Sequence, residues 1–464
     1  MSDSNWLQAM AKYNADRADY ATHVGGAVEL AHMLQAETAS HPDRFAKLAL
    51  LLTSSHDPAY AESLLLGLAD AAEPVDTSVV CDAIRHIASL AQPSTERWLA
   101  YPLRHHLDGD IPDDIIELVL DRALHAPEPT TDVWSRSTSS DDRRGVGETI
   151  YGNGINVARG KAVEMLGDLL VHDTDGHRTA LAEPHLLQLA ADPSVAVRSC
   201  TAHLIGASLR HARPRAIEAF AVLVETDDRL LATHTVERLT LYITNGDGSG
   251  LTMPVIRRML ASAHDDVRQV GGRFSTYLAL SKDEDELLQQ HRSGPDPAIR
   301  RGIAEVAAEL LTRNLNVPLA MDVLSQLFND TDATVRQAAA AVAVALRGQR
   351  LRPFRALLTG LIDSAALVDA QAQLLITLDR APDRVDDLVM HCAQRFVALH
   401  GDGLANFATA SASDTQQLAT LLVRAYAQSA NIQIRQQALD LFDQLLELDA
   451  YGVQETMDSV ERDW

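Results

Sequence analysis

The sequence predicts an all-α fold in which helical repeats stack into a right-handed α-solenoid. The chain has 464 residues, more than one compact core usually holds, which indicates several domains or one elongated repeat array. Hydrophobic residues make up 46% of it and aromatic residues only 5%, and Ala and Leu are abundant, a composition that favours helices packed on helices. The third observation is an internal repeat.

The repeat begins with a turn that contains Asp or Asn, continues with Val or Ile followed by Arg, and ends in an apolar, often Ala-rich helix. Five copies are clear, and their arginines are Arg198, Arg268, Arg300, Arg336 and Arg435. In two of them an Asp-Pro pair, Asp192-Pro193 or Asp296-Pro297, precedes the helix, and its Asp is expected to cap the helix. The 70 residues between the first two arginines hold a degenerate unit at 226–243, and the 99 residues before the last hold three intervals of about 33. A period in the thirties with two helices per unit is typical of a helical solenoid.

The stretch GNGINVARGKAVEMLG, residues 152–167, belongs to the same series, with Asn156 in the turn and Arg159 at the repeat position. It also resembles a phosphate-binding loop, but Ala162 follows Gly-Lys where a Ser or Thr hydroxyl would bind Mg²⁺, and five residues separate Gly154 from Gly160 instead of four. We therefore interpret it as a repeat helix that Asn156 caps, and expect no bound nucleotide or other cofactor.

Three regions follow from these patterns. Residues 1–125 are predicted to form an irregular helical region, because stretches such as 57–70 run from an Asp-Pro pair into a leucine-rich face. Residues 126–154 are rich in Pro, Ser, Thr and Gly and are predicted to form a mobile loop. Residues 155–464 are predicted to form the repeat array.

The predicted loop carries the candidate partner-binding residues Trp134, Arg143 and Arg144. Long loops on a repeat scaffold often have a function, and a solvent-exposed Trp is unusual. The alternative is that Trp134 packs back against the nearest helix.

Two short segments offer ligands for metals but lack the required spacing. Residues 245–256 resemble a calcium loop, yet the twelfth position is Ile256 where a bidentate Glu is needed. Residues 172–178 contain two His and two Asp without a rigid helical spacing, which is more typical of a solvated turn. No nucleophile or base motif is present either, so we expect no metal site and no catalysis.

The net charge indicates which partners are unlikely, and the cysteines and the absence of a signal peptide indicate where the protein is located. The net charge of −24 argues against nucleic acids and anionic membranes, which bind clustered Lys and Arg. The three cysteines are far apart and form no CxxC pair, which is typical of a reducing compartment. Because no signal peptide and no apolar run of about 18 residues is found, a cytoplasmic location is expected.

The repeat resembles HEAT repeats, in which an Asp caps the second helix and an Arg contacts a neighbouring unit. The order of NWLQAMAKYN (5–14), HPDRFAKLALLL (41–52), DPAYAESLLLGLAD (57–70) and GINVARGKAVEMLGDLL (154–170) is similar to the helical C-terminal sensor region of bacterial STAND NTPases, which act in antiphage defence. This resemblance implies a non-catalytic module that binds a viral protein.

The sequence departs from that family in one respect, because it contains no Walker motif and no effector motif. The NTPase and effector modules are therefore expected on the same longer chain or on separate subunits. We expect the concave side of the array to bind a phage protein with a basic face. The alternative function is a general cytosolic HEAT-repeat scaffold for cellular proteins.

Overall fold

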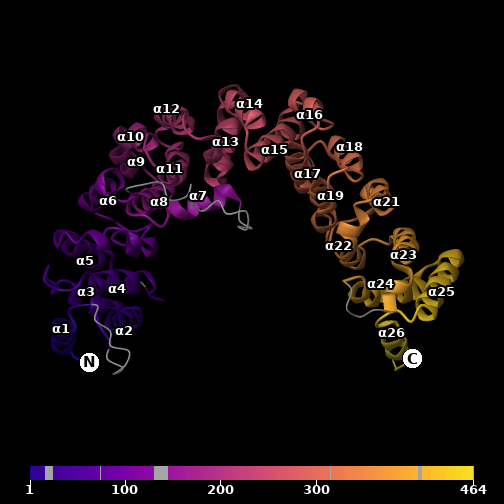
Figure 1. Ribbon diagram of the computed structural model, residues 1–464, viewed down its shortest axis with the longest axis horizontal. Coiled ribbons are helices and arrows are strands. Elements are labelled where there is room, and N and C mark those ends of the chain that lie inside the picture. The colour runs from indigo at the N-terminus through magenta and orange to yellow at the C-terminus, as the bar shows by residue number, and fades with distance from the viewer. Residues whose placement is uncertain (16–24, 74, 130–144, 314, 406–409, 463–464) are drawn as a thin grey trace. The chain divides into compact units, whose positions relative to one another are not determined.

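The computed structural model describes residues 1–15, 25–73, 75–129, 145–313, 315–405 and 410–462 (Figure 1). These residues form helices and connecting turns and contain no β-strand. The chain divides into two compact units, Met1–Val255 and Ile256–Trp464. The predicted all-α solenoid of HEAT-like repeats is thereby confirmed as the fold class.

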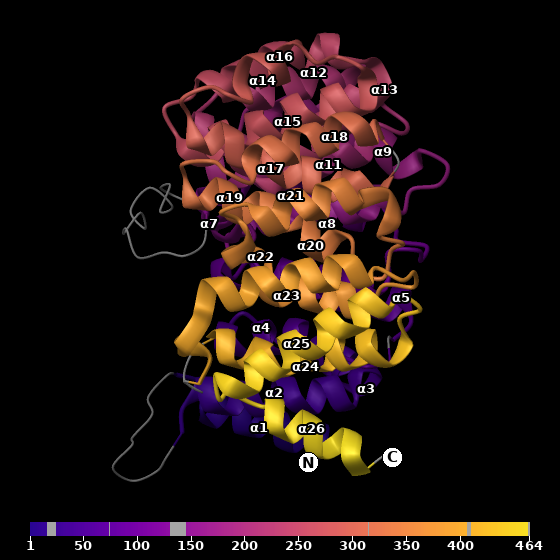
Figure 2. The ribbon, with the colours of Figure 1, turned by 90° about the vertical axis from the view of Figure 1, so that its right-hand side faces the viewer.

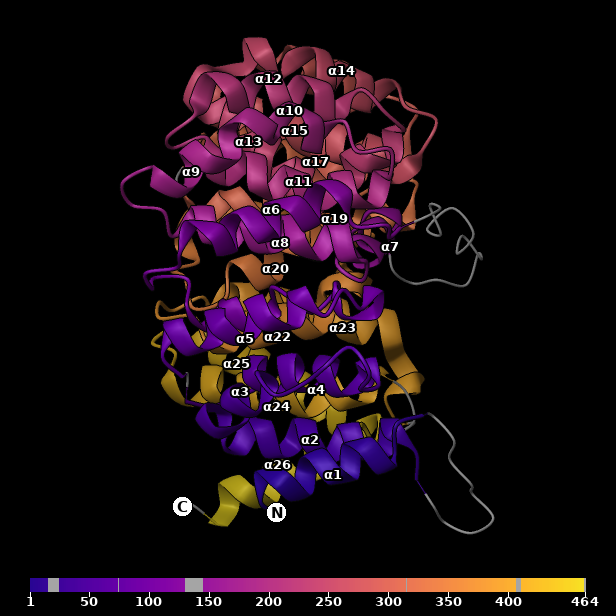
Figure 3. The ribbon, with the colours of Figure 1, turned by 90° about the vertical axis from the view of Figure 1, so that its left-hand side faces the viewer.

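The first unit is a succession of short antiparallel helices (Figure 3). Its α-helices are α1 (Asp3–Lys12), α2 (Ala27–Ser40), α3 (Pro42–Ala49), α4 (Pro58–Ala69), α5 (Thr77–Ser89), α6 (Asp113–His125), α7 (Val146–Gly154), α8 (Ala158–Val171), α9 (His177–Ala182), α10 (Leu186–Ala190), α11 (Val195–Ser208), α12 (Arg213–Val224) and α13 (His234–Asp247). Helix α14 (Met253–Ala261) spans the boundary between the units.

The second unit repeats this design (Figure 2). Its α-helices are α15 (Asp265–Lys282), α16 (Glu286–His291), α17 (Pro297–Leu310), α18 (Val317–Leu327), α19 (Ala333–Ala340), α20 (Val342–Ala345), α21 (Arg355–Asp363), α22 (Leu367–Asp379), α23 (Asp386–His400), α24 (Ala410–Gln428), α25 (Ile432–Glu447) and α26 (Val453–Arg462). None of the described helices combines the length and the apolar character needed to cross a membrane.

Each unit is built from two layers of helices. One layer carries most of the repeat arginines, and we call it the arginine layer: α8 packs on α11 and α11 on α13 in the first unit, and α15 packs on α17 and α17 on α19 in the second. The opposite layer contains stacked pairs such as α10 with α12, and α21 with α23. Leu, Ile, Val and Ala side chains fill the space between the layers, because the helices turn apolar faces toward it.

Side-chain caps start several of these helices. The carboxylates of Asp57, Asp296 and Asp332 accept hydrogen bonds of 2.8–3.0 Å from backbone N–H groups in the first turns of α4, α17 and α19. A proline follows Asp57 and Asp296 at the first helical position, where its missing N–H costs nothing. The cap expected at Asp296 is confirmed.

Two expected caps are wrong. Helix α11 is capped by Ser194 instead of Asp192, whose carboxylate contacts an arginine of the preceding repeat. Helix α8 begins at Ala158 without a side-chain cap. Asn156 does not cap it, because its amide donates to the Gly152 carbonyl at the end of α7 and its Oδ1 accepts from Arg97.

The predicted loop 126–154 is wrong over its last part, where α7 is helical. Two of its glycines, which indicated a loop, lie in close helix contacts: a Cβ on Gly147 would collide with the Ala232 carbonyl oxygen, and one on Gly154 with the Ala196 carbonyl oxygen. Ile150, between them, is fully buried. Small residues here let α7 approach its neighbours closely. The candidate residues Trp134, Arg143 and Arg144 lie outside the described residues.

Candidate protein-binding groove

Four of the sequence-predicted repeat arginines share one contact. Arg198, Arg268, Arg300 and Arg336 each donate to the backbone carbonyl six residues earlier, over 2.5–2.8 Å. That carbonyl lies in the turn before the arginine's own helix. The arginine therefore ties each turn to the helix that follows it, and this explains why the Val/Ile-Arg pattern recurs at a fixed place.

Some of these arginines also form an ion pair with an Asp of the next repeat. Arg159 Nε lies 2.9 Å from Asp192, and Arg300 lies 2.6 and 2.9 Å from the two oxygens of Asp330. Both pairs are nearly buried, with about a tenth or less of each side chain exposed. Burial would raise the pKa of the Asp330 carboxyl, but the hydrogen bonds from Arg300 and the Asp332 N–H outweigh it and hold this pKa below its ordinary value.

Arg435 has a different environment. It lies on α25, which stacks on α23 in the opposite layer, and its side chain is exposed. Its guanidinium carbon sits 5.2 Å from the centre of the Tyr426 ring. The local pattern that predicted a repeat arginine is present, but this arginine forms no ion pair with a described carboxylate.

Three of the four glycines in the phosphate-loop-like stretch serve helix packing. A Cβ on Gly154 would collide with the Ala196 carbonyl of α11, and one on Gly160 would collide with the carbonyl of Gly154. A Cβ on Gly167 would collide with the His203 ring. These glycines allow α7, α8 and α11 to lie against one another, which answers why the stretch is glycine-rich.

Glu164 lies half-buried in the same stretch and accepts a 2.6 Å hydrogen bond from the Tyr151 hydroxyl. Burial raises the pKa of its carboxyl above the ordinary value of 4.5 and outweighs the opposing effects of Tyr151, His203 and Lys161, while Asp168 adds to the increase. The folded state thus loses stability as the pH rises through this elevated pKa, since only the folded state resists ionisation.

We therefore expect Glu164→Gln to melt at a higher temperature than the wild type near neutral pH. The amide oxygen still accepts from Tyr151, and the buried charge is gone. The difference in melting temperature should vanish near pH 4 and grow as the pH rises. Exposed Glu218→Gln is the matched control and should show no such trend; a difference independent of pH would contradict the explanation.

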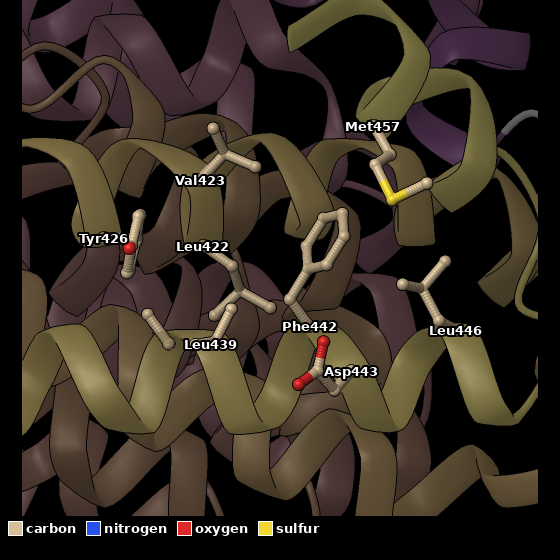
Figure 4. A pocket seen from close by; sticks show the side chains of 9 residues that line it. Leu422, Val423, Tyr426, Leu439, Phe442, Asp443, Leu446 and Met457 are labelled. Carbon is tan, nitrogen blue, oxygen red and sulfur yellow. The ribbon is translucent and has the colours of Figure 1, made fainter. Parts of the chain in front are cut away.

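An apolar groove of about 220 Å³ lies between α24, α25 and α26 in the second unit (Figure 4). Three helices line it: Leu422, Val423 and Tyr426 on α24, Ala438, Leu439, Phe442, Asp443 and Leu446 on α25, and Met457 on α26. Tyr426 and Leu439 lie at one end of the row of side chains, and Leu446 and Met457 at the other. Asp443 is the single charged residue in this lining.

Part of the groove is open to solvent. Tyr426 is 42% exposed and Leu439 39% exposed, whereas Phe442 forms a nearly buried floor. Ile432, in the first turn of α25, is 80% exposed. An exposed row of aliphatic and aromatic side chains costs free energy in water, which contact with another apolar surface would recover.

A stripe of acids runs beside the apolar row. Leu439, Phe442 and Leu446 are spaced three and four residues apart on α25, and the acids Asp440, Asp443 and Glu447 follow with the same spacing one position later. All three acids are exposed, and none of them forms an ion pair with a described Lys or Arg. The groove therefore combines an apolar row with a negative edge.

Sequence reasoning missed this groove. The sequence of α25 does contain a pattern typical of such a groove, an apolar stripe next to an acidic stripe. An amphipathic helix of a solenoid looks the same when its apolar stripe is fully covered, so the packing of α24 and α26 was needed to show that the stripe stays partly open. Among the described side chains, no group of three His, Cys, Asp or Glu is arranged to hold a metal ion.

No family model matches the sequence, and no curated protein matches it. Solved structures with similar folds include yeast importin-β (Kap95p), 13% identical, with a TM-score of 0.42 over 96% of this chain and 57% of that one. A structure of Kap95p with RanGDP is 13% identical over 100% and 63% of the two chains (TM-score 0.36), and an engineered protein is 15% identical over 96% and 99% (TM-score 0.27). The chain thus spans less than two thirds of the length of each Kap95p chain, and the likeness concerns the fold alone.

Proposed function

We propose that the chain is a non-catalytic protein-recognition module that binds its partner through the groove between α24, α25 and α26. The observation that carries this proposal is the apolar row of Leu439, Phe442 and Leu446, which stays partly open to solvent at Leu439 and beside Tyr426 and runs next to the acidic stripe. Grooves of this kind accept one face of an amphipathic helix, whose side chains at i, i+3, i+4 and i+7 fill the row.

The acidic stripe supports a basic partner. Asp440, Asp443 and Glu447 stand along one side of the groove, and the whole chain has a net charge of −24. Lys or Arg on the flank of a bound helix would face these carboxylates, and long-range attraction would speed its association. Salt should weaken such binding.

We further propose that the partner is a viral protein and that the module is the sensor part of an antiphage STAND-type system with separate NTPase and effector modules. The support for this is the resemblance of residues 5–14, 41–52, 57–70 and 154–170 to that family. The second candidate function is a general cytosolic scaffold that uses the same groove for cellular proteins.

The test is Leu439→Asp, which places a charge in the row at a partly exposed position. A synthetic amphipathic helix with one leucine stripe flanked by lysines should bind the variant at least about tenfold more weakly than the wild type, that is by about 1.4 kcal/mol. Val368→Asp is the matched control, because Val368 is 62% exposed on α22 of the same unit but outside the groove. Equal affinity for all three proteins would contradict the groove assignment.

The same variants distinguish the two candidate functions when they are used as bait in extracts of phage-infected and uninfected cells. A sensor should retain a basic protein from infected cells alone, and Leu439→Asp should lose it while Val368→Asp keeps it. Recovery of the same protein from uninfected cells would favour the scaffold.

A further inference from the structure

A cluster of cations and aromatic rings lies in the first unit, between the turn that follows η1 (Pro93–Thr95), the short helix η2 (Tyr101–His105) and the first turn of α8. We call it the cation–aromatic cluster, and its members are Arg97, Trp98, Tyr101, Arg104 and Lys161. The Trp98 and Tyr101 ring centres are 5.8 Å apart. Lys161 is the lysine of the phosphate-loop-like stretch.

The cations lie over the rings. The Arg97 guanidinium carbon is 4.4 Å from the Trp98 ring centre, and Lys161 Nζ is 4.4 Å from that of Tyr101. Arg104 approaches the same tyrosine, with its guanidinium carbon 5.1 Å from the ring centre and its Nη1 donating to the hydroxyl over 2.7 Å. Two like charges are therefore held around one ring, where they repel each other.

No carboxylate neutralises these cations by direct contact. Within the residues that the structure describes, Arg97, Arg104 and Lys161 form no ion pair, although many other arginines of this acidic chain do. Arg97 donates to the neutral Asn156 amide oxygen, and its buried Nε has no hydrogen-bond partner among the described atoms.

The nearest carboxyl groups are engaged elsewhere. Glu164 accepts from the Tyr151 hydroxyl, and Glu62 is hydrogen-bonded to Ser94. Burial raises the pKa of both carboxyls, so each holds its negative charge less readily than an exposed glutamate. Glu62 attracts Arg97, and Glu164 and Asp168 attract Lys161, but only without direct contact. Arg104 forms no ion pair with a described carboxylate, so the positive charge of the cluster is only partly compensated.

From this geometry we infer that the cation–aromatic cluster is a second binding site, which takes the carboxylates of an acidic peptide segment from a partner protein. Arg104 is exposed and Lys161 is partly exposed, so an extended acidic segment can contact both. Charge-assisted hydrogen bonds to carboxylates are the strongest that these two side chains make, and an anion between them also relieves their repulsion.

Two other ligand classes fit the cluster less well. Arg97 and Lys161 each occupy one face of a ring, 4.4 Å from the centres of Trp98 and Tyr101, and so compete with a nucleobase for that face. A phosphate at a helix N-terminus needs free backbone N–H groups, but that of Arg159, in the first turn of α8, donates to the Glu128 carbonyl. The cluster is also distinct from the groove proposed above, which lies in the other unit and attracts the opposite charge.

The test is calorimetric titration of the full chain with an unstructured Glu-rich peptide at low salt. Arg104→Gln combined with Lys161→Gln should weaken binding at least about tenfold. Arg215→Gln, which removes an arginine already paired with Glu218, is the matched control and should bind like the wild type. Arg104→Gln alone, at an exposed position, should lose part of the affinity without a change in melting temperature.

Two further measurements distinguish this site from the groove and an acidic peptide from a phosphate ligand. Leu439→Asp should leave peptide binding unchanged, so a failure of the groove proposal would not affect this one. The inference is overturned if the double variant binds the peptide as well as the wild type. It is also overturned if inorganic phosphate or ATP displaces the peptide at micromolar concentration, because the site would then prefer phosphate.

Discussion

Arg159→Met is expected to lower the free energy of unfolding by about 3–5 kcal/mol, the usual cost of removing one partner of a buried ion pair. The methionine would leave the Asp192 carboxylate, whose side chain is only 8% exposed, without its counter-charge. It would also remove the donor to the Ala126 carbonyl, which Arg159 Nη1 contacts over 3.0 Å. Loss of both contacts should loosen the junction of α8 with the repeat that follows it.

Thermal and urea unfolding would measure this effect, with Arg435→Met as the matched control. Arg435 is the exposed member of the repeat series and should cost less than about 0.5 kcal/mol. Combining Arg159→Met with Asp192→Asn should restore part of the loss, because the orphaned charge is removed while the acceptor for the Ser194 N–H remains. Equal losses for Arg159→Met and Arg435→Met would contradict the role assigned to the buried pair.

Gly302→Ala is expected to destabilise the second unit by about 1–3 kcal/mol, although alanine is the better helix former. Gly302 on α17 faces α15 so closely that a Cβ would collide with the Gln269 carbonyl oxygen. The relation is reciprocal, since a Cβ on Gly272 of α15 would collide with the Ile299 carbonyl of α17. One added methyl group must therefore push the two helices apart.

The control is a Gly→Ala substitution at a helical position where the added methyl group meets no other atom. No atom lies within 4 Å of the Cβ position at Gly360, inside α21, so Gly360→Ala should stabilise the protein by about 0.5–1 kcal/mol. Melting temperatures of the two variants should move in opposite directions. A stabilising Gly302→Ala would show that the contact between α15 and α17 is looser than the structure has it.

The helical repeat was predictable because its signals are local. A cap, a Val/Ile-Arg pair and an apolar helix lie within one segment, and each works through contacts such as the one from Arg300 to the Gly294 carbonyl. The layer in which a helix stacks is not a local property. Arg435 matches the pattern, yet its helix packs in the opposite layer, so the pattern alone assigned it to the wrong surroundings.

The candidate sites were less predictable, because they depend on residues distant in the chain. Lys161 meets Tyr101 across 60 positions of sequence, and nothing in either segment indicates this contact. The glycines of α7 were misleading for a related reason. In an isolated sequence glycine favours a loop, whereas Gly147 and Gly154 are required where two helices approach closely, and this becomes visible only with the neighbouring helix present.

Ion pairs between helices of the second unit differ in how far they are buried. A more exposed pair contributes less to the coupling between neighbouring repeats. Arg300 and Asp330 are about nine-tenths buried, but the pairs farther along, Arg355 with Asp387 and Arg424 with Asp379, are at least one-third exposed and correspondingly weak. In a nearest-neighbour description of a repeat protein, the repeats around α23 to α25 then open locally at a lower cost than those around α17 and α19, and their amide hydrogens exchange sooner. The groove lies between α24, α25 and α26, so an occupant that contacts these helices would add coupling between them and slow their local opening.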